Sequence, residues 1–246
     1  MSSQGKRTES EASRTLAQIA PRVGFSDPRR YESTSRFLFG DIPLQGTRVL
    51  DIGAGTGALS AWAAVRGASS VVALEPGRDG STQGSAAVLE SVIADFGLGD
   101  RIELRRETLE GLAGAGQFDL AILSGVINHL NEAAVVRLHE DRDAFDEYVV
   151  VLRLLRSLLR PGAFAIVTDV GRKSIWNTIG RQGPWTRDIE WHKHQQPHTW
   201  VEVFRSAGFE LHDVRWSPLK WTGRLTGNRL AQYFTMSHFV LRFRAV

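Results

Sequence analysis

The feature that most constrains this chain is an apolar run that ends in a glycine-rich turn. Residues 48–57 read RVLDIGAGTG, which places Gly53, Gly55 and Gly57 at alternate positions. Beyond the turn, apolar residues recur at helical spacing: Leu59, Trp62, Ala63 and Val65. This order predicts a strand, a glycine loop and a helix. Glycines let a ligand lie against the backbone, and the amides of the loop and helix N-terminus face an electron-rich or anionic group.

The next apolar run, Val71 to Leu74, ends in Glu75. A carboxylate at the tip of the second strand of a doubly wound sheet holds the hydroxyls of a ribose. The glycine spacing differs from the dinucleotide fingerprint G-x-G-x-x-G, because this chain reads G-x-G-x-G. The stretch VLDIGAGTG resembles the first motif of class I S-adenosylmethionine (SAM) methyltransferases.

Later landmarks follow the order of the same family. FDLAIL at 118–123 is similar to its fourth strand, and LLRPG at 158–162 is similar to the turn before its fifth strand. The resemblance covers residues 45–170 well. It implies an α/β fold: a doubly wound, seven-stranded, Rossmann-like sheet of order 3-2-1-4-5-7-6, with an antiparallel last strand and helices on both faces.

The pattern of the chain predicts the remaining elements and their grouping. Residues 1–40 are expected to form an N-terminal tail and helical segment, in which 1–20 are a frayed tail that leads into a short helix with Leu16, Ile19 and Ala20. Residues 41–246 are expected to form the methyltransferase domain. Within it, 170–200 is expected to be an inserted lid over the substrate. The expected helices span 30–39, 85–96, 142–160 and 199–207. The expected strands include 102–104, 163–168, 209–216 and 233–243.

Composition excludes several classes of protein. The 246 residues contain no cysteine, which excludes disulfides, thiolate metal sites and cysteine nucleophiles. The polar N-terminus lacks the apolar core of a signal peptide, and no apolar run is long enough to span a membrane. A cytoplasmic location is therefore expected.

Charge and tryptophan are concentrated near the C-terminus. Residues 171–246 hold twelve Lys or Arg against five Asp or Glu, although the whole chain has a net charge of only +3. The same region contains six of the seven tryptophans. One interpretation is a solvated basic face over an aromatic core. The other is a substrate surface for an anionic or sugar-like ligand, with indoles stacking on it.

The resemblance assigns the cofactor, SAM, to residues after the first four strands. The implied binding residues are Tyr31, Asp51, Gly53, Ala54, Gly55, Gly57, Glu75, Pro76, Glu107, Thr108, Ser124 and Gly125. Glu107, or Glu110 in its place, would receive the adenine amino group. Tyr31 and Arg36 are candidates for the methionine end of the cofactor, although core packing is favoured for Tyr31 and a solvated surface position for Arg36.

The catalytic candidates are His194, His129 and Asp169. A hydroxyl acceptor is a poor nucleophile and needs a base beside it. His194 lies in the expected lid, in a W-x-x-H-Q stretch similar to one in sugar or cell-surface methyltransferases. His129 follows the fourth strand, where sheet topology places Ser124 to His129 at the site. Asp169, at the end of the fifth strand, would orient either imidazole or assist the hydroxyl directly.

We expect no metal. His139, Asp141, Asp143 and Asp169 are suitable ligands for Mg²⁺, but residues 140–143 fit better as a charged helix start.

The sequence therefore predicts a SAM-dependent O-methyltransferase acting on a sugar, saccharide or hydroxylated metabolite. The alternatives are N- or C-methylation of a natural product, or an RNA-binding protein that retains the fold. The expected partner is a small-molecule or saccharide acceptor. Nucleic acid is disfavoured, because the fourth strand is not followed by the N/D-P-P-Y/W box of base-amine methyltransferases. Sequence alone leaves the oligomeric state open.

Overall fold

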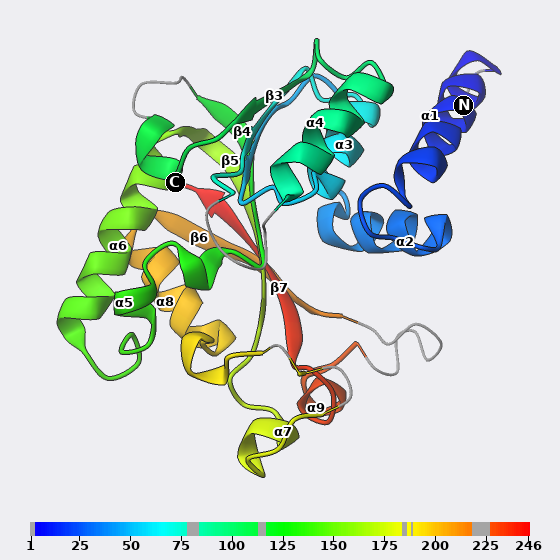
Figure 1. Ribbon diagram of the computed structural model, residues 1–246. Helices are drawn as coiled ribbons and strands as arrows, with labels where there is room; N and C mark the ends of the chain where they lie inside the picture. The colour runs from blue at the N-terminus through cyan, green and yellow to red at the C-terminus, as the bar shows by residue number, and fades with distance from the viewer. Residues whose placement is uncertain (1–2, 78–83, 113–116, 184–185, 188, 218–226) are drawn as a thin grey trace. The chain divides into compact units, whose positions relative to one another are not determined.

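The structure, a computed structural model, describes residues 3–77, 84–112, 117–183, 186–187, 189–217 and 227–246. Among these residues, seven strands form one sheet of order β3-β2-β1-β4-β5-β7-β6, which confirms the predicted fold class (Figure 1). The strands are β1 (Arg48–Ile52), β2 (Ser70–Leu74), β3 (Ile102–Arg105), β4 (Phe118–Ser124), β5 (Leu159–Val170), β6 (Phe209–Trp216) and β7 (His238–Ala245). Contacts within the chain divide it into two units, residues 1–122 and 123–246.

The first unit carries the parallel part of the sheet. β2 pairs in parallel with both β1 and β3. Four of the five residues of β1 and of β2 are buried, as expected for parallel strands, whose faces are covered by helices. Helix α3 (Ala58–Val65) contacts β1 and β2, and α4 (Ser85–Asp95) contacts β3.

The N-terminal segment is more ordered than the sequence predicts. The frayed tail expected before the short helix at Leu16 is wrong, because helix α1 spans Ser3–Ile19 and contacts both α2 (Pro28–Phe39) and α3. Leu16 and Ile19 are buried at its C-terminal end. Such tertiary contacts stabilise a helix whose sequence is largely polar.

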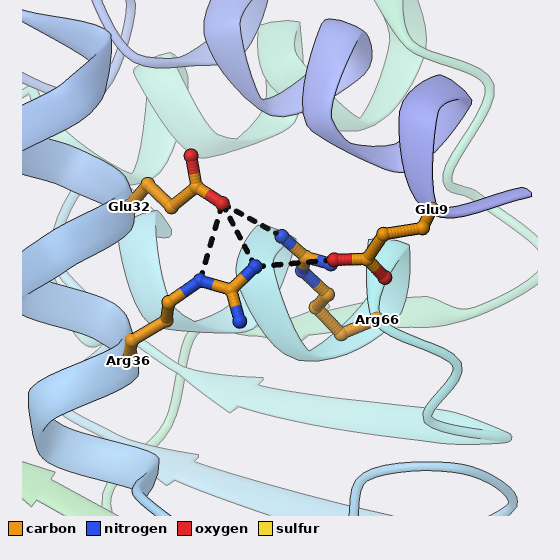
Figure 2. Close-up of polar contacts among 4 residues, drawn as sticks. All are labelled: Glu9, Glu32, Arg36 and Arg66. Carbon is orange, nitrogen blue, oxygen red and sulfur yellow. Dashed lines mark hydrogen bonds and ion pairs between the residues drawn. The ribbon is translucent and has the colours of Figure 1, made fainter. Parts of the chain in front are cut away.

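Four charged side chains connect these three helices (Figure 2). Glu9 of α1 pairs with Arg36 of α2 at 3.1 Å and with Arg66, which follows α3, at 2.5 Å. Glu32 of α2 pairs with the same two arginines at 2.9 and 3.2 Å. The hydrogen bond from Arg66 lowers the pKa of Glu9. A shared network of this kind stabilises more than isolated surface ion pairs do, so Arg36 is part of a structural cluster.

The second unit carries the antiparallel part. β7 lies between β5 and β6 and pairs antiparallel with both, which confirms the predicted orientation of the last strand. Helices α6 (Arg142–Ser157) and α8 (Pro197–Ser206) lie side by side and contact strands of this unit (Figure 1). The ring of Phe204 in α8 stacks on Phe243 of β7 with centroids 4.1 Å apart, which fixes the helix on the sheet.

Two predicted boundaries in this unit are wrong. The helix expected over 142–160 ends at Ser157, and β5 already begins at Leu159, before the Pro-Gly pair. Both leucines of the run 158–159 are buried, so an apolar pair counted toward the helix belongs to its last turn and to the next strand. The strand expected from Tyr233 begins at His238, because Asn228 caps a short helix, α9 (Arg229–Tyr233).

Short helices complete the described chain: 3₁₀ helices η1 (Leu109–Leu112), η2 (Ile127–His129) and η3 (Trp191–Lys193), with α5 (Glu132–Val135) and α7 (Ile175–Thr178). The expected lid, 170–200, contains α7 and η3. Trp185 and Trp221, two of the tryptophans expected at a substrate surface, lie outside the described residues. No helix in the described part of the chain has the length and apolar character needed to cross a bilayer.

Candidate active site

The loop between β1 and α3 has backbone angles that favour glycine. Gly53, Gly55 and Gly57 have φ of 65°, 54° and 82°, in the left-handed region. A side chain at Gly57 would also collide with Leu89 of α4, whereas one at Gly55 would meet no atom within 4 Å. The loop therefore leaves space over Gly55, where a ligand can approach the backbone.

Glu75 follows the last residue of β2 and turns its carboxylate onto this loop. Its Oε2 accepts a hydrogen bond from the amide of Gly55 at 2.7 Å, and its Oε1 accepts one from the amide of Gly77 at 3.1 Å. The residue is only 2% exposed. A carboxylate has about four lone-pair sites, so each oxygen retains capacity for a further donor, such as a ribose hydroxyl. The residues present therefore fit the nucleoside that the sequence predicts.

Two buried side chains support the loop. Asp51, at 2% exposure, accepts a hydrogen bond from Ser60 of α3 at 2.6 Å. Tyr31 is fully buried against Trp62, and its hydroxyl donates to the carbonyl of Ala58 at 2.5 Å. Direct contact between Tyr31 and the cofactor was one of two interpretations; the structure places the ring in the core, where it holds the start of α3.

Asp51 leads to a prediction on stability. Burial raises the pKa of its carboxyl to about 6, whereas in the unfolded chain it ionises at about pH 4. Between these values the unfolded state loses its proton first, so stability falls as the pH rises. The cost is absent below about pH 4 and reaches about 3 kcal/mol at pH 7. Asp51→Asn should therefore raise the urea midpoint at pH 7, and this gain should disappear at pH 4.

The control is Asp100→Asn, which removes a charge at an exposed position and should leave both midpoints unchanged. A lower midpoint for Asp51→Asn at pH 7 would contradict the prediction, because the hydrogen bond from Ser60 would then outweigh the cost of the buried charge.

The other candidates of the first unit lie at the ends of β1, β2 and β3. The amide of Ala54 donates to the carbonyl of Leu74 at 2.9 Å, which ties the glycine loop to the end of β2. Pro76, after Glu75, is half-buried. Since no described contact distinguishes their roles, the assignment of these residues to the cofactor stays a prediction.

Glu107 was predicted to receive the adenine amino group. Its carboxylate pairs with Arg105 at 3.4 Å, and its side chain is 36% exposed. Thr108 and Glu110 are exposed. The structure leaves both carboxylates accessible, so the choice between Glu107 and Glu110 remains a prediction.

Ser124 and Gly125, at the end of β4, belong to the second unit. The hydroxyl of Ser124 lies 3.0 Å from that of Thr168, and the amide of Gly125 donates to the carbonyl of Thr168 at 3.0 Å. These contacts join the ends of β4 and β5. Gly125 also lines the cavity that contains the catalytic candidates.

That cavity has a volume of about 230 Å³ and lies within the second unit. The end of β5, the start of β7 and two connecting segments form its wall. Its charged, imidazole and amide side chains are Asn128, His129, Asp169, Glu190, His194 and His238. The three predicted catalytic candidates, far apart in the sequence, are therefore brought together by the fold.

His194 and Asp169 form a largely buried pair on this wall. Nδ1 of His194 lies 2.7 Å from Oδ1 of Asp169, and the two side chains are 13% and 2% exposed. Two further donors reach the carboxylate: the amide of Val170 at 2.8 Å and Nε1 of Trp200 at 3.3 Å. With Asp169 as acceptor, Nδ1 of His194 carries the proton and Nε2 is the basic nitrogen.

His129 has a carboxylate partner as well, but in a solvated network. Its Nδ1 lies 2.7 Å from Glu132, with side-chain exposures of 43% and 44%. Glu132 also pairs with Lys193 at 2.9 Å, and Lys193 pairs with Glu190 at 2.9 Å. Hydrogen bonds from His129 and Lys193 lower the pKa of Glu132. Exposed pairs of this kind hold their geometry weakly.

Two residues of the site were missed by sequence reasoning, and a third was placed there only as part of a longer run. His238 was expected inside the last strand; it lines the cavity, and burial lowers the pKa of its imidazole, so the ring is neutral at pH 7. Trp200 was counted toward a substrate surface, yet it is fully buried and donates to Asp169. Asn128 lies in the run that topology placed at the site, which was the only signal for it.

Two residues close to His194 in the sequence, Gln195 and His192, are not part of the described cavity wall. Gln195 is buried, and its Nε2 donates to the carbonyl of Val135 at 2.6 Å, which anchors the segment beside His194. His192 is exposed and is not part of the described cavity wall.

The residues considered for Mg²⁺ are engaged elsewhere. Asp141 caps α6 by accepting from the amides of Asp143 and Ala144, which confirms the charged helix start. His139 lies against Arg172, with nitrogens about 3.0 Å apart. Within the described ranges, no group of three or more potential ligand side chains could hold a metal ion.

Together, the strand order, the glycine loop and the acid at the tip of β2 define a nucleoside-binding sheet of the class I methyltransferases. Comparison with known proteins agrees. Residues 11–214 match the family described as a methyltransferase domain, so the chain belongs to this family. It is a SAM-dependent methyltransferase, and SAM is its cofactor.

The matched relatives include two ubiquinone biosynthesis O-methyltransferases. The protein of Ruegeria pomeroyi is 29% identical over 209 residues, which cover 79% of this chain and 74% of the relative. That of Azorhizobium caulinodans is 26% identical over 196 residues, which cover 78% and 71%.

Solved structures support the fold. Magnesium protoporphyrin IX methyltransferase (ChlM) from Synechocystis PCC 6803 with bound SAH matches with a TM-score of 0.58 and 16% identity, covering 99% of this chain and 95% of that chain. A SAM-dependent methyltransferase from Mesorhizobium loti matches with a TM-score of 0.56 and 18% identity, covering 86% and 96%.

The carboxylate of Glu75 gives a prediction on cofactor affinity. Glu75→Ala should weaken SAM binding by about 1–3 kcal/mol, because a charged hydrogen-bond acceptor is lost; titration calorimetry measures this. Since the carboxylate also accepts from Gly55 and Gly77, thermal unfolding must show that the variant is folded. Glu75→Gln, which keeps one acceptor oxygen, should lose less affinity. Unchanged affinity in Glu75→Ala would refute the ribose role.

Proposed function

We propose that this chain methylates a hydroxyl oxygen of a small hydroxylated metabolite, with His194 as the general base. The observation that carries the proposal is the His194–Asp169 pair, 2.7 Å apart on the wall of a cavity. Amines and phenolates react with little assistance, whereas a neutral hydroxyl needs a base at hydrogen-bond distance. An imidazole oriented by a buried carboxylate suits a hydroxyl acceptor.

In the proposed reaction, Nε2 of His194 takes the hydroxyl proton while the acceptor oxygen forms the new bond to carbon. When bound, SAM supplies a methyl group that its sulfonium already activates, and a neutral thioether leaves. Asp169 fixes the tautomer of His194 and stabilises the imidazolium until the proton passes to water. The glycine loop and Glu75 hold the nucleoside. This scheme requires no metal.

The choice of His194 over His129 rests on burial. Both imidazoles have a carboxylate at 2.7 Å, but the His194 pair is 13% and 2% exposed and the His129 pair 43% and 44%. Electrostatic coupling is stronger and less screened away from water. His129 therefore fits better as a polar wall residue that contacts the acceptor.

The segment 170–200 is proposed to cover the acceptor. It supplies Ile189, Glu190 and His194 to the described cavity wall, and the buried Gln195 anchors it. An inserted segment with these contacts can enclose the acceptor and exclude water from the reaction.

We propose a narrower class of acceptor than the sequence predicts. A sugar was expected partly because of the C-terminal tryptophans, but the described cavity wall contains none of them. The relatives named for ubiquinone biosynthesis act as O-methyltransferases by their names. A phenol or related hydroxylated aromatic compound is therefore our preferred acceptor, ahead of a saccharide.

Product mapping tests the proposal. The enzyme would be incubated with methyl-labelled SAM and a panel of phenols, monosaccharides and amines, and the methylated atom located by mass spectrometry and NMR. Label on oxygen supports the proposal; label only on nitrogen or carbon would favour the alternative of N- or C-methylation. RNA binding with a steep salt dependence and no transfer would support the interaction-module alternative.

A further inference from the structure

A second cavity, of about 360 Å³, lies within the same unit of the chain as the catalytic cavity that contains His194 and Asp169. Its charged side chains are Lys173 and Arg229, and its aromatic side chains are Trp216 and Tyr233. None of its described lining residues is Asp or Glu. The wall of the second cavity therefore carries positive charge that no carboxylate of the same wall balances.

The sequence around the second cavity has the same bias. Residues 170–187 contain four Lys or Arg and residues 214–246 contain six, and neither stretch contains Asp or Glu. Lys173 and Arg229 are exposed, and neither pairs with a carboxylate in the part of the chain that the structure describes. Two cations on one wall repel each other, and a bound anion turns this repulsion into attraction.

The aromatic side chains of the second cavity are held in place. Trp216, the last residue of β6, packs edge-on against Phe239 of β7, with ring centroids 6.0 Å apart. The hydroxyl of Tyr233 in α9 donates to that of Thr178 in α7, which lies beside it, at 3.2 Å (Figure 1). Rings that are already fixed lose little freedom when a ligand binds. The cavity thus combines cations with rigid aromatic surface, which suits an acid joined to an apolar body.

The second cavity adjoins the catalytic cavity. Each of three segments, residues 169–173, 194–196 and 236–238, contributes side chains to both walls. Since consecutive Cα atoms are only about 3.8 Å apart, positions this close in the chain place the two cavities next to each other. One molecule of moderate length can therefore occupy both.

Hydrogen bonds connect these three segments. The carbonyl of Ser237 accepts from the amide of Gly171 at 2.8 Å, and its hydroxyl donates to the carbonyl of Lys173 at 3.1 Å. Gln196, with its amide oxygen turned towards this loop, accepts from the amides of Arg172 and Lys173 at 3.0 and 2.6 Å. Ser237 also has φ of 56°, a conformation that persists where surrounding contacts impose it and that is frequent at ligand sites.

We infer that the second cavity binds an acidic group of the methyl acceptor, a carboxylate, phosphate or sulfate, through Lys173 and Arg229, while a hydroxyl of the same molecule is methylated beside His194. This inference rests on the proposed function, because it concerns the same acceptor. The acid accepts charge-assisted hydrogen bonds from both cations, and the aromatic side chains contact the apolar part that joins it to the hydroxyl. The acceptor is thus an anion that spans both cavities.

Matched acceptors test this inference. Hydroxyphenylalkanoic acids with side chains of increasing length and the corresponding primary amides offer the same hydroxyl, but only the acids are charged. The wild-type enzyme should prefer the acid over the amide, at one or more lengths, by roughly tenfold or more in kcat/KM, because hydrogen bonds to a charged group are stronger. Added salt should reduce this preference, since Lys173 and Arg229 are exposed.

Charge variants assign the preference to the two cations. Lys173→Gln and Arg229→Gln should each move the ratio of acid to amide towards one. The double variant with Lys173→Glu and Arg229→Glu should prefer hydroxyphenylalkyl amines, which are cationic, over the acids. Arg181→Glu is the matched control: Arg181 is exposed and lies in the same acid-free stretch, but is not part of the described wall, so the ratio should stay unchanged. A ratio measured within one variant is insensitive to a general loss of stability.

A ratio near one in the wild-type enzyme, or a ratio that both glutamine variants leave unchanged, overturns the inference. So does inhibition by phenylalkanoic acids that is not competitive with the acceptor, because the second cavity would then bind a separate ligand. Calorimetric titration with the methyl ethers of the same acids and amides measures the preference without turnover. Equal affinity of acids and amides there overturns the inference, whereas the proposed function fails only if no hydroxylated compound of the wider panel is methylated on oxygen.

Discussion

His194→Ala should lower turnover by roughly a hundredfold or more while SAM affinity stays unchanged. General-base catalysis contributes typically 10²–10⁴-fold, and the imidazole, on the wall of the cavity, would be the base for the hydroxyl proton. The loss should appear in kcat with a hydroxylated acceptor, measured by transfer of labelled methyl. Added imidazole should restore part of the activity, because the variant leaves room for a small base.

His192→Ala is the matched control for this variant. His192 lies two residues away, is exposed, and is not among the described residues of the cavity wall, so its removal should have little effect. Full activity in His194→Ala would refute its role and move the assignment to His129. Loss of SAM affinity together with turnover would indicate a structural role in place of a catalytic one.

Asp169→Asn should reduce turnover by a similar or larger amount, roughly 10²–10⁴-fold, without removing the imidazole. The carboxylate accepts from His194, Val170 and Trp200. Oδ1 accepts from both His194 and the Val170 amide, whereas Oδ2 accepts from Trp200 alone at 3.3 Å, so the amide oxygen is expected to take the place of Oδ1 and the new NH₂ group the place of Oδ2. The ring then keeps its proton on Nδ1, but the neutral amide no longer stabilises the imidazolium that forms when Nε2 takes the hydroxyl proton.

The tautomer can be observed directly. Nitrogen NMR of the labelled imidazole should show the proton on Nδ1 in the wild-type enzyme and in Asp169→Asn, so that the loss of turnover is assigned to the missing charge. Trp200→Phe removes one donor to Asp169 but keeps the pair with His194, so it should lower stability and preserve the tautomer. If Asp169→Asn kept near-normal turnover, orientation of His194 by this carboxylate would not contribute to catalysis.

Local sequence pattern was sufficient to predict the cofactor part of the fold. The apolar runs before Gly53 and Glu75 and the glycine spacing between them predicted two buried parallel strands and the loop that joins the first of them to its helix. These features depend on neighbours within a few residues, and steric limits on φ leave glycine as the favoured residue for the loop. The strand order followed from the resemblance of later motifs, and the structure has that order.

Other features depended on contacts between distant residues. The sequence predicted a frayed tail where most of α1 forms, because Glu9 pairs with Arg36 and Arg66 of other segments. The start of the last strand was misplaced because the cap at Asn228 competes with the apolar pattern after it. Trp200 was indistinguishable in sequence from a surface tryptophan until the fold buried it beside Asp169.

The sequence by itself therefore determined the class of fold, the cofactor and a short set of catalytic candidates, because these depend on residue type and local spacing. Tertiary structure distinguishes the candidates by their burial. It buried the carboxylate beside His194 and left the one beside His129 in solvent. Burial and hydrogen-bond pairing are properties of the packed chain, since each depends on side chains that are distant in sequence.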